Sequence, residues 1–107
     1  MGFVARLLVV DDDPQIRYLL EVLLSGSGHE VTVADSARAA LEHLRKETPD
    51  LILLDIMMPD MDGLSLLGRI RAVRRLSKVP VILFTGGGRE LEGVGKALGA
   101  DLALIHI

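Results

Sequence analysis

Five short apolar runs divide the chain. They are LLVV (7–10), VTVA (31–34), LILL (51–54), VILF (81–84) and LALI (102–105). Runs that are continuously apolar, rather than alternating, are typical of strands buried on both faces of a parallel sheet. The segments between them are long enough to form crossover helices. The pattern therefore predicts a doubly wound α/β fold, in which strand and helix alternate four times before a fifth strand.

The first predicted helix follows the run LLVV. Asp13 is a suitable N-cap, and Pro14 suits the first helical position because its missing N–H needs no partner there. One apolar stripe at helical spacing follows, made of Ile16, Leu19, Leu20, Leu23 and Leu24. We expect the helix to end at Gly26 or Gly28, where glycine can adopt the conformation that terminates a helix.

Three further helices are indicated by the same kind of pattern. Ser36 can cap a second helix that stops before Pro49, and a third begins near Gly63. The expected inward positions are Ala37, Ala40, Leu41 and Leu44 in the second helix, and Leu64, Leu67, Ile70 and Val73 in the third. A fourth helix over 89–98 is weaker, because it contains two glycines, which each cost roughly 1 kcal/mol in a helix interior.

Composition narrows the class of protein. A chain of 107 residues that is 50% hydrophobic suits one folded domain. Its net charge of -3 argues against binding to nucleic acid or to an anionic membrane. There is no cysteine, no apolar run long enough to span a membrane and no signal peptide, so we expect a cytoplasmic protein.

Acidic residues stand where two of the predicted strands end. Asp11 and Asp12 follow the first strand and Asp55 follows the third, while Thr85 and the glycines 86–88 follow the fourth. Sites in such folds lie beyond the carboxyl ends of the strands. Three converging carboxylates would raise the pKa of at least one of them, unless a divalent cation such as Mg²⁺ is bound. The alternative is a helix cap with solvated loop charges, and the glycines can be a simple loop.

Four segments together resemble a known family. LLVVDDDP, LILLDIMMPDMDG, PVILFTG and KALGAD are similar, in order and spacing, to the receiver domain of bacterial response regulators. The resemblance covers nearly the whole chain, so residues 1–107 are expected to form one receiver domain. It implies a flavodoxin-like, five-stranded parallel sheet of order 2-1-3-4-5, in which the chain ends before the family's fifth helix. It also implies a sensor histidine kinase as partner.

The resemblance assigns roles to individual residues. Asp55 corresponds to the phosphoacceptor, whose carboxylate attacks phosphorus and forms an acyl phosphate. Asp12 is expected to bind Mg²⁺ directly, Asp11 to bind it through water, and Met57 to contribute its backbone carbonyl. Thr85 corresponds to the hydroxyl that contacts the phosphoryl group.

Two glycines and a proline complete the implied site. Gly86 corresponds to the small residue that keeps Asp55 accessible, and Pro59 and Gly63 shape the loop after Asp55.

The C-terminal part departs from the family pattern. His106 stands where the family has a lysine that pairs with the phosphoryl group, and Ala103 replaces the aromatic residue of the switch. The missing fifth helix is expected to leave VILF and LALI partly bare. We therefore expect self-association or a swapped dimer through the uncovered sheet face.

Other functions fit less well. A receiver-like interaction module that no longer switches by phosphorylation is the main alternative, because of His106 and Ala103. A phosphatase of the haloacid dehalogenase type would need a second aspartate where Met57 stands. No G-x-G-x-x-G follows the first strand, which argues against dinucleotide binding. A basic cluster, made of Arg69, Arg71, Arg74, Arg75 and Lys78, is expected to be a solvated face.

Overall fold

The computed structural model describes residues 4–84 of the chain. Strands and helices alternate in the order β1 (Arg6–Val10), α1 (Pro14–Gly26), β2 (Glu30–Ala34), α2 (Ala37–Lys46), β3 (Leu51–Asp55), α3 (Gly63–Ala72), a short 3-10 helix η1 (Arg74–Leu76) and β4 (Val81–Phe84). The predicted helix over 89–98 and the predicted fifth strand lie outside the described residues. Within residues 4–84, no helix is long and apolar enough to cross a bilayer.

The four described strands form one parallel sheet with the order β2-β1-β3-β4. This order agrees with the predicted doubly wound, flavodoxin-like arrangement. Val10 is paired with Ala34 on one side and with Leu54 on the other, and Asp55 is paired with Phe84. Because β1 and β3 are neighbours and run in the same direction, the residues that follow them meet at one edge of the sheet.

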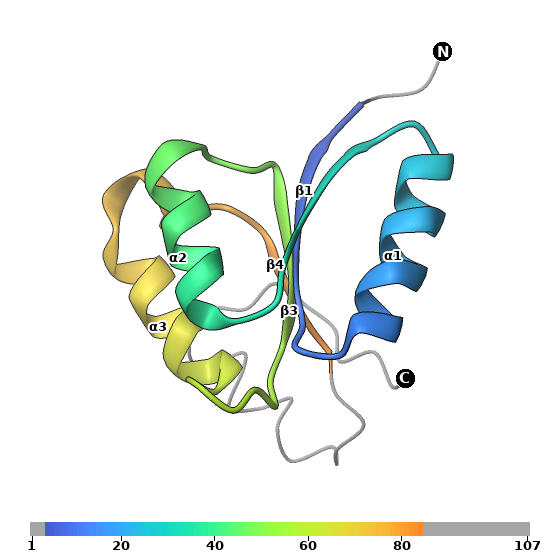
Figure 1. Ribbon diagram of the computed structural model, residues 1–107. Coiled ribbons are helices and arrows are strands. Elements are labelled where there is room, and N and C mark those ends of the chain that lie inside the picture. The colour runs from blue at the N-terminus through green and yellow to red at the C-terminus, as the bar shows by residue number, and fades with distance from the viewer. Residues whose placement is uncertain (1–3, 85–107) are drawn as a thin grey trace.

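The sheet separates two layers of helices. Figure 1 shows α1 on one face and α2 and α3 on the other. The larger core lies between the sheet and α2 and α3, and its fully buried side chains include Leu8, Ile52, Leu54, Leu66, Leu67 and Ile70. On the other face, a smaller cluster is formed by Val9, Leu53 and Phe84, against which Ile16, Leu20 and Leu24 pack.

Each of the helices α1, α2 and α3 begins at a polar side chain that accepts a hydrogen bond from a backbone N–H of the first turn. Asp13 accepts from the Gln15 N–H at 2.8 Å, and Ser36 accepts from the Ala39 N–H at 3.0 Å. Both caps were predicted from the sequence. Asp62 caps α3 by accepting from the Ser65 N–H at 2.8 Å, which we had not predicted. These bonds satisfy donors that the first helical turn leaves without partners.

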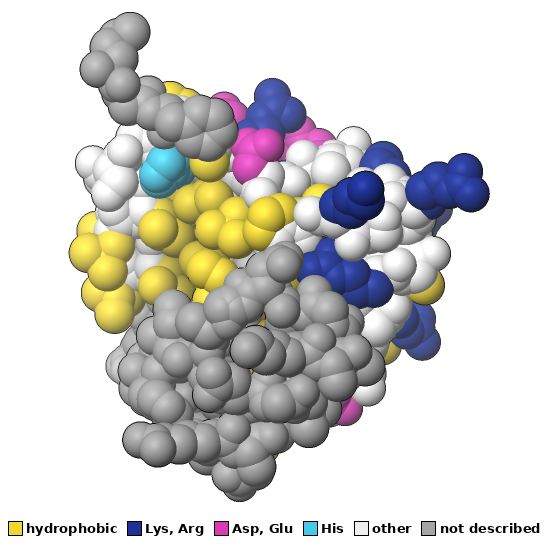
Figure 2. Space-filling model, turned by 180° about the vertical axis from the view of Figure 1, so that it is seen from behind, with side chains coloured by type: hydrophobic (Ala, Val, Ile, Leu, Met, Phe, Trp, Pro, Cys, Tyr) yellow, Lys and Arg dark blue, Asp and Glu magenta, His cyan; other side chains and the backbone are white. Residues whose placement is uncertain are grey.

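The apolar stripe predicted for α1 is only partly buried. Leu19 and Leu23 are 49% and 56% exposed, and Tyr18 and Val22 are exposed as well. The helix contacts the sheet through Ile16, Leu20 and Leu24, which follow one another at a spacing of four residues. Of the predicted stripe, Leu19 and Leu23 therefore lie outside the buried contact with the sheet. On the side of the molecule seen in Figure 2, hydrophobic side chains gather next to a group of lysine and arginine side chains.

Two predictions about the third helix and the fourth strand need correction. Val73 is 42% exposed and follows α3 as its C-cap, whereas Leu66 is fully buried. The run VILF is not left bare, because Val81, Leu83 and Phe84 are all buried. The run LALI lies outside the described residues.

The basic cluster is not simply a solvated face. The Arg71 guanidinium donates to the backbone carbonyls of Leu76 at 3.2 Å and Val79 at 2.7 Å. Arg75 donates to the Leu44 carbonyl at the end of α2 and to Thr48. These two arginines therefore hold the connection between α3 and β4 in place.

Candidate functional site

Three aspartates meet at the carboxyl ends of β1 and β3. One carboxylate oxygen from each of Asp11, Asp12 and Asp55 lies within 4.8 Å of the others. Asp11 and Asp55 are only 3% and 8% exposed, whereas Asp12 is exposed to solvent. The sequence predicted this convergence, and it arises because β1 and β3 are adjacent parallel strands.

Asp11 and Asp55 of this cluster also accept hydrogen bonds from neighbouring groups of the chain, which fix their position. Asp11 Oδ1 accepts from the Asp13 N–H at 2.9 Å, and the Asp11 carbonyl accepts from Arg17 Nη1 at 2.8 Å. Asp55 Oδ1 accepts from the Met57 N–H at 3.0 Å. Arg17 was not predicted as part of this site, since its position in α1 gives no sign that its side chain reaches back to β1.

The electrostatics of the cluster disfavour three negative charges. The pKa of Asp55 is raised from its ordinary value of 3.8 to about 7, mainly by burial. The Asp11 carboxyl and the charge of Asp12 also raise this pKa, whereas the hydrogen bond from the Met57 N–H lowers it. Burial also raises the pKa of Asp11, opposed by the Asp13 N–H and by a hydrogen bond with the Asp55 side chain. The prediction of a raised pKa is confirmed, although burial contributes more than the repulsion that we had expected to be the cause.

The loop after Asp55 requires glycine at its end. The Gly63 N–H donates to the Ile56 carbonyl at 2.7 Å. A Cβ at this position would lie 2.3 Å from the Asp55 carbonyl oxygen and 2.7 Å from Ile56 Cα, which are both backbone atoms. The close approach of α3 to β3 therefore depends on Gly63, which agrees with the expectation that Gly63 shapes the loop after Asp55.

The same loop is joined to α2 by a residue that we had not singled out. Asp60 accepts from the N–H of Ala37 at 3.2 Å and from the N–H of Arg38 at 3.1 Å. Burial works against the charge of Asp60, but these N–H groups hold its pKa below the ordinary value. The sequence carries no signal for this contact, because the two partners are more than 20 residues apart.

The residues of the cluster fit a hard divalent cation. All three donors are carboxylate oxygens, which Mg²⁺ prefers. A cation would also offset both the burial of the Asp55 charge and the smaller repulsion by Asp11 and Asp12 that raise the pKa of Asp55. The Met57 side chain is 67% exposed, so it does not contribute to the core. The other residues that we predicted for the site, Thr85, Gly86 and His106, lie outside the described residues, as does Ala103.

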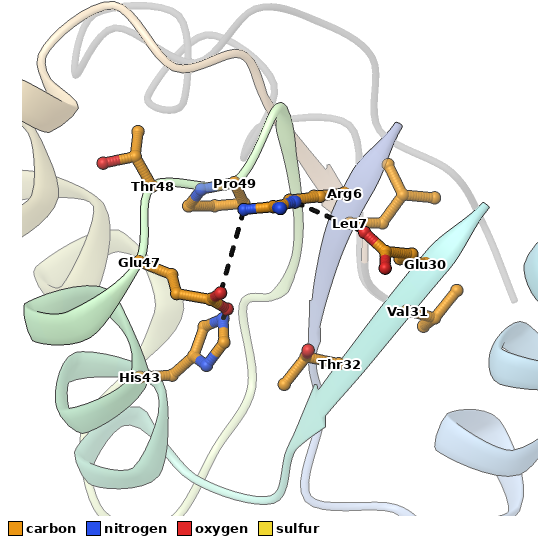
Figure 3. Close-up of a pocket in the computed structure, with 9 residues that line it drawn as sticks. All are labelled: Arg6, Leu7, Glu30, Val31, Thr32, His43, Glu47, Thr48 and Pro49. Atoms are coloured by element: carbon orange, nitrogen blue, oxygen red, sulfur yellow. Dashed lines mark hydrogen bonds and ion pairs between the residues drawn. The ribbon is translucent and has the colours of Figure 1, made fainter. Parts of the chain in front are cut away.

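A separate pocket lies at the opposite edge of the sheet. Its volume is about 280 Å³, and it is bounded by the starts of β1 and β2 and the end of α2. Figure 3 shows Arg6 across its mouth, paired with Glu30 at 3.3 Å and Glu47 at 3.8 Å. Glu47 also faces His43, with 3.6 Å between Oε2 and Nε2. Because Arg6 is paired with both glutamates, and these side chains are at least half exposed, the pocket offers less for chemistry than the aspartate cluster.

Comparison with known sequences places this geometry in a family. The family model described as the response regulator receiver domain matches residues 7–104. The chain is 45% identical over 84 residues to an uncharacterized 14.6 kDa protein from the sodA1 3' region of Leptolyngbya boryana, covering 78% of this chain and 64% of that protein. It is 42% identical over 96 residues to the transcriptional regulatory protein AfsQ1 of Streptomyces coelicolor, covering 89% of this chain and 41% of AfsQ1. The chain thus spans less than two thirds of either relative.

Solved structures agree with the sequence comparison. The chemotaxis protein CheY4 of Vibrio cholerae superimposes with a TM-score of 0.90 at 30% identity, covering 97% of this chain and 87% of CheY4. The receiver domain of the Francisella response regulator 1452 gives a TM-score of 0.85 at 30% identity, covering 95% of this chain and 83% of that domain. Strand order, the aspartates at the ends of β1 and β3 and the match over residues 7–104 lead to one conclusion: the chain belongs to the family of response regulator receiver domains of two-component systems.

Proposed function

We propose that this receiver domain is a phosphorylation-controlled switch that accepts a phosphoryl group on Asp55. The observation that carries the proposal is the placement of Asp55 at the end of β3, nearly buried and within 4.8 Å of two further aspartates. A carboxylate in this position can act as a nucleophile towards phosphorus. The hydrogen bond from the Met57 N–H to Asp55 Oδ1 orients the carboxylate before the reaction.

The proposed donor is the phosphohistidine of a sensor histidine kinase. One carboxylate oxygen of Asp55 attacks phosphorus in line with the leaving nitrogen. The P–N bond breaks as the new P–O bond forms, and the histidine side chain leaves, taking up a proton. The product is an acyl phosphate on Asp55, whose hydrolysis by water returns the free carboxylate and inorganic phosphate. The domain would therefore catalyse its own phosphorylation and dephosphorylation without being an enzyme that acts on a separate substrate.

Mg²⁺ is the proposed cofactor of this reaction. Asp12 and Asp55 would hold it directly, Asp11 through water, and Met57 through its backbone carbonyl. When bound, the ion supplies charge neutralisation for the phosphoryl oxygens. Asp11 accepts hydrogen bonds from the Asp13 N–H and from Arg17, and it would thereby keep the turn 11–13 after β1 in one conformation.

The remaining parts of the proposal concern residues 85–107 and the partners. Thr85 would donate its hydroxyl to the phosphoryl group, Gly86 would leave room for it, and His106 would stand in for the usual lysine. We propose that residues 1–107 form this one domain and act in the cytoplasm.

Self-association also stays a proposal. The run VILF offers little free surface for it, because three of its four residues are buried. The exposed side chains of Tyr18, Leu19, Val22 and Leu23 in α1 are a better candidate for a dimer contact. Sedimentation over a range of concentrations, with Leu23→Glu as the variant, tests this. A wild type that stays monomeric at high concentration contradicts it.

Phosphoryl uptake tests the main proposal. The protein is incubated with acetyl phosphate, with and without Mg²⁺, and its intact mass is measured. We expect a phosphoryl adduct that depends on Mg²⁺ and is absent in Asp55→Ala. Circular dichroism shows whether that variant is folded.

No adduct on the folded wild type would refute the switch. The alternative of an interaction module that no longer switches, which His106 and Ala103 favour, would then be preferred.

A further inference from the structure

Asp60 connects the loop after Asp55 to the beginning of α2. Its two carboxylate oxygens accept from two successive N–H groups, Oδ1 from Ala37 at 3.2 Å and Oδ2 from Arg38 at 3.1 Å. These are the first two residues of α2, where backbone donors have no partner within the helix. The positive end of the helix dipole favours the carboxylate there. Asp60 thus makes a charge-assisted contact between two segments that are distant in the sequence.

The position of this contact bears on the acidic cluster. The loop leaves the sheet at Asp55, where Met57 donates to Asp55 Oδ1, and rejoins the structure at Gly63, which donates to the Ile56 carbonyl. Asp60 lies between these two points, three residues after Met57. Since α2 packs on the sheet through Ala37 and Ala40, which are fully buried, it is a rigid anchor for the loop.

We propose that Asp60 is a positioning residue for the phosphoryl-acceptor site. By holding the loop against α2, it keeps the Met57 N–H at Asp55 Oδ1 and the Met57 carbonyl at a fixed place beside the cluster. The proposal rests on the proposed Mg²⁺ site for its effect on metal binding, but the effect on the Met57 N–H holds without metal. Residues that orient metal ligands in this indirect way commonly contribute 10- to 100-fold to metal affinity.

A purely structural role for Asp60 would be that of a second cap on α2. Ser36 already caps this helix through the Ala39 N–H at 3.0 Å. Ser36→Ala therefore removes an acceptor from the same helix end without changing a bond of the loop. The comparison of Asp60→Ala with Ser36→Ala separates the positioning role from the capping role. Asp60→Asn keeps one side-chain oxygen as an acceptor, and it replaces Asp60→Ala in these tests if Asp60→Ala does not fold.

The first test is hydrogen exchange of the Met57 amide, followed by NMR in the metal-free protein. We expect Asp60→Ala to speed this exchange about tenfold, as the loss of a charge-assisted hydrogen bond would, while the amides of β1 exchange as in the wild type. Asp60→Asn should give a smaller increase, and Ser36→Ala should leave the Met57 amide unchanged. An unchanged Met57 amide in Asp60→Ala, or an equal increase in Ser36→Ala, would overturn the proposal.

The second test is the affinity for Mg²⁺, measured by isothermal titration calorimetry. Asp60→Ala should bind Mg²⁺ about tenfold more weakly than the wild type, and Ser36→Ala should bind it with unchanged affinity. Equal affinities of Asp60→Ala and the wild type would overturn the effect on the metal site. A wild type that binds no Mg²⁺ would instead refute the proposed function, and the exchange of the Met57 amide would still decide whether Asp60 positions the loop.

Discussion

The raised pKa of Asp55 makes the stability of this domain depend on pH in a predictable direction. An acid whose pKa is higher in the folded protein than in the unfolded chain stabilises the fold most at low pH, where it is protonated in both states. That contribution is present below about pH 4 and is lost as the pH rises through about 7. Above pH 7 the fold must hold a buried charge beside Asp11 and Asp12. Asp55→Asn removes this charge and keeps an oxygen that can accept from the Met57 N–H.

The size of the effect follows from the two pKa values. The difference between 3.8 and about 7 corresponds to roughly 4 kcal/mol of unfolding free energy, which is an upper limit. The neutral amide accepts a weaker hydrogen bond from Met57 than a carboxylate does, which costs about 1 kcal/mol. We therefore expect Asp55→Asn to be about 2 to 3 kcal/mol more stable than the wild type at pH 8, and no more stable at pH 4. Between these limits the difference grows by at most about 1.4 kcal/mol per pH unit, because one proton is involved.

Urea unfolding in EDTA, from pH 4 to pH 8.5, measures this difference. Asp35→Asn is the control, because Asp35 is an exposed aspartate outside the cluster and its loss changes the net charge equally. Its stability should follow the wild type at every pH. Two results would refute the argument that the fold holds a destabilising charge at Asp55. One is a difference in unfolding free energy between Asp55→Asn and the wild type that does not change with pH. The other is an unfolding free energy of Asp55→Asn below that of the wild type at pH 8.

Three further predictions use the same unfolding assay. At pH 8, the unfolding free energy of the wild type should rise with the logarithm of the Mg²⁺ concentration, and that of Asp55→Asn should rise much less. Equal stabilisation of the two proteins would contradict a metal site at Asp55. Gly63→Ala should lower the unfolding free energy by about 3 kcal/mol, because the new Cβ meets the backbone of β3. Gly68→Ala in α3 should raise the unfolding free energy by about 0.5 kcal/mol, because its Cβ would lie in open space. Arg71→Met should lower the unfolding free energy by about 2 kcal/mol, because the carbonyls of Leu76 and Val79 lose their donor. Arg69→Met, at an exposed position, should change the unfolding free energy little. Similar values for the two variants would argue against a structural role for Arg71.

The parts of the fold that could be predicted from the sequence are those set by local pattern. Each continuous apolar run within the described residues became a strand, and Asp13 and Ser36 cap the helices that they were expected to cap. The acidic cluster could be predicted because it depends only on strand order and on which residues end the strands. No contact between distant side chains was needed for that inference.

The misses concern contacts that depend on how the elements pack. The apolar stripe on α1 shows that one face is hydrophobic but not how wide its contact with the sheet is, so the pattern did not reveal that Leu19 and Leu23 are exposed. The bond from Arg17 to the Asp11 carbonyl depends on side-chain reach across a turn. The contact of Asp60 with α2 depends on how a loop folds over a helix that precedes it in the chain. Periodicity carries no information on any of these three.

The three aspartates at the ends of β1 and β3 lower the stability of the folded protein, so they are a disadvantage to a fold in which they have no function. A buried aspartate whose pKa is raised to about 7 destabilises the protein at neutral pH, and a neutral asparagine could accept the same hydrogen bond from Met57. Asp11 is buried beside it with a raised pKa of its own, and the backbone bonds of Asp13 and Met57 hold both carboxylates in fixed orientations. A bound cation would relieve the repulsion within such a cluster. Under the proposed function, the phosphoryl group on Asp55 would bring further negative charge to the site and would therefore need the same cation. For the proposed switch, such a cation or phosphoryl group would change the conformation of the domain only as far as it binds one conformation more tightly than another.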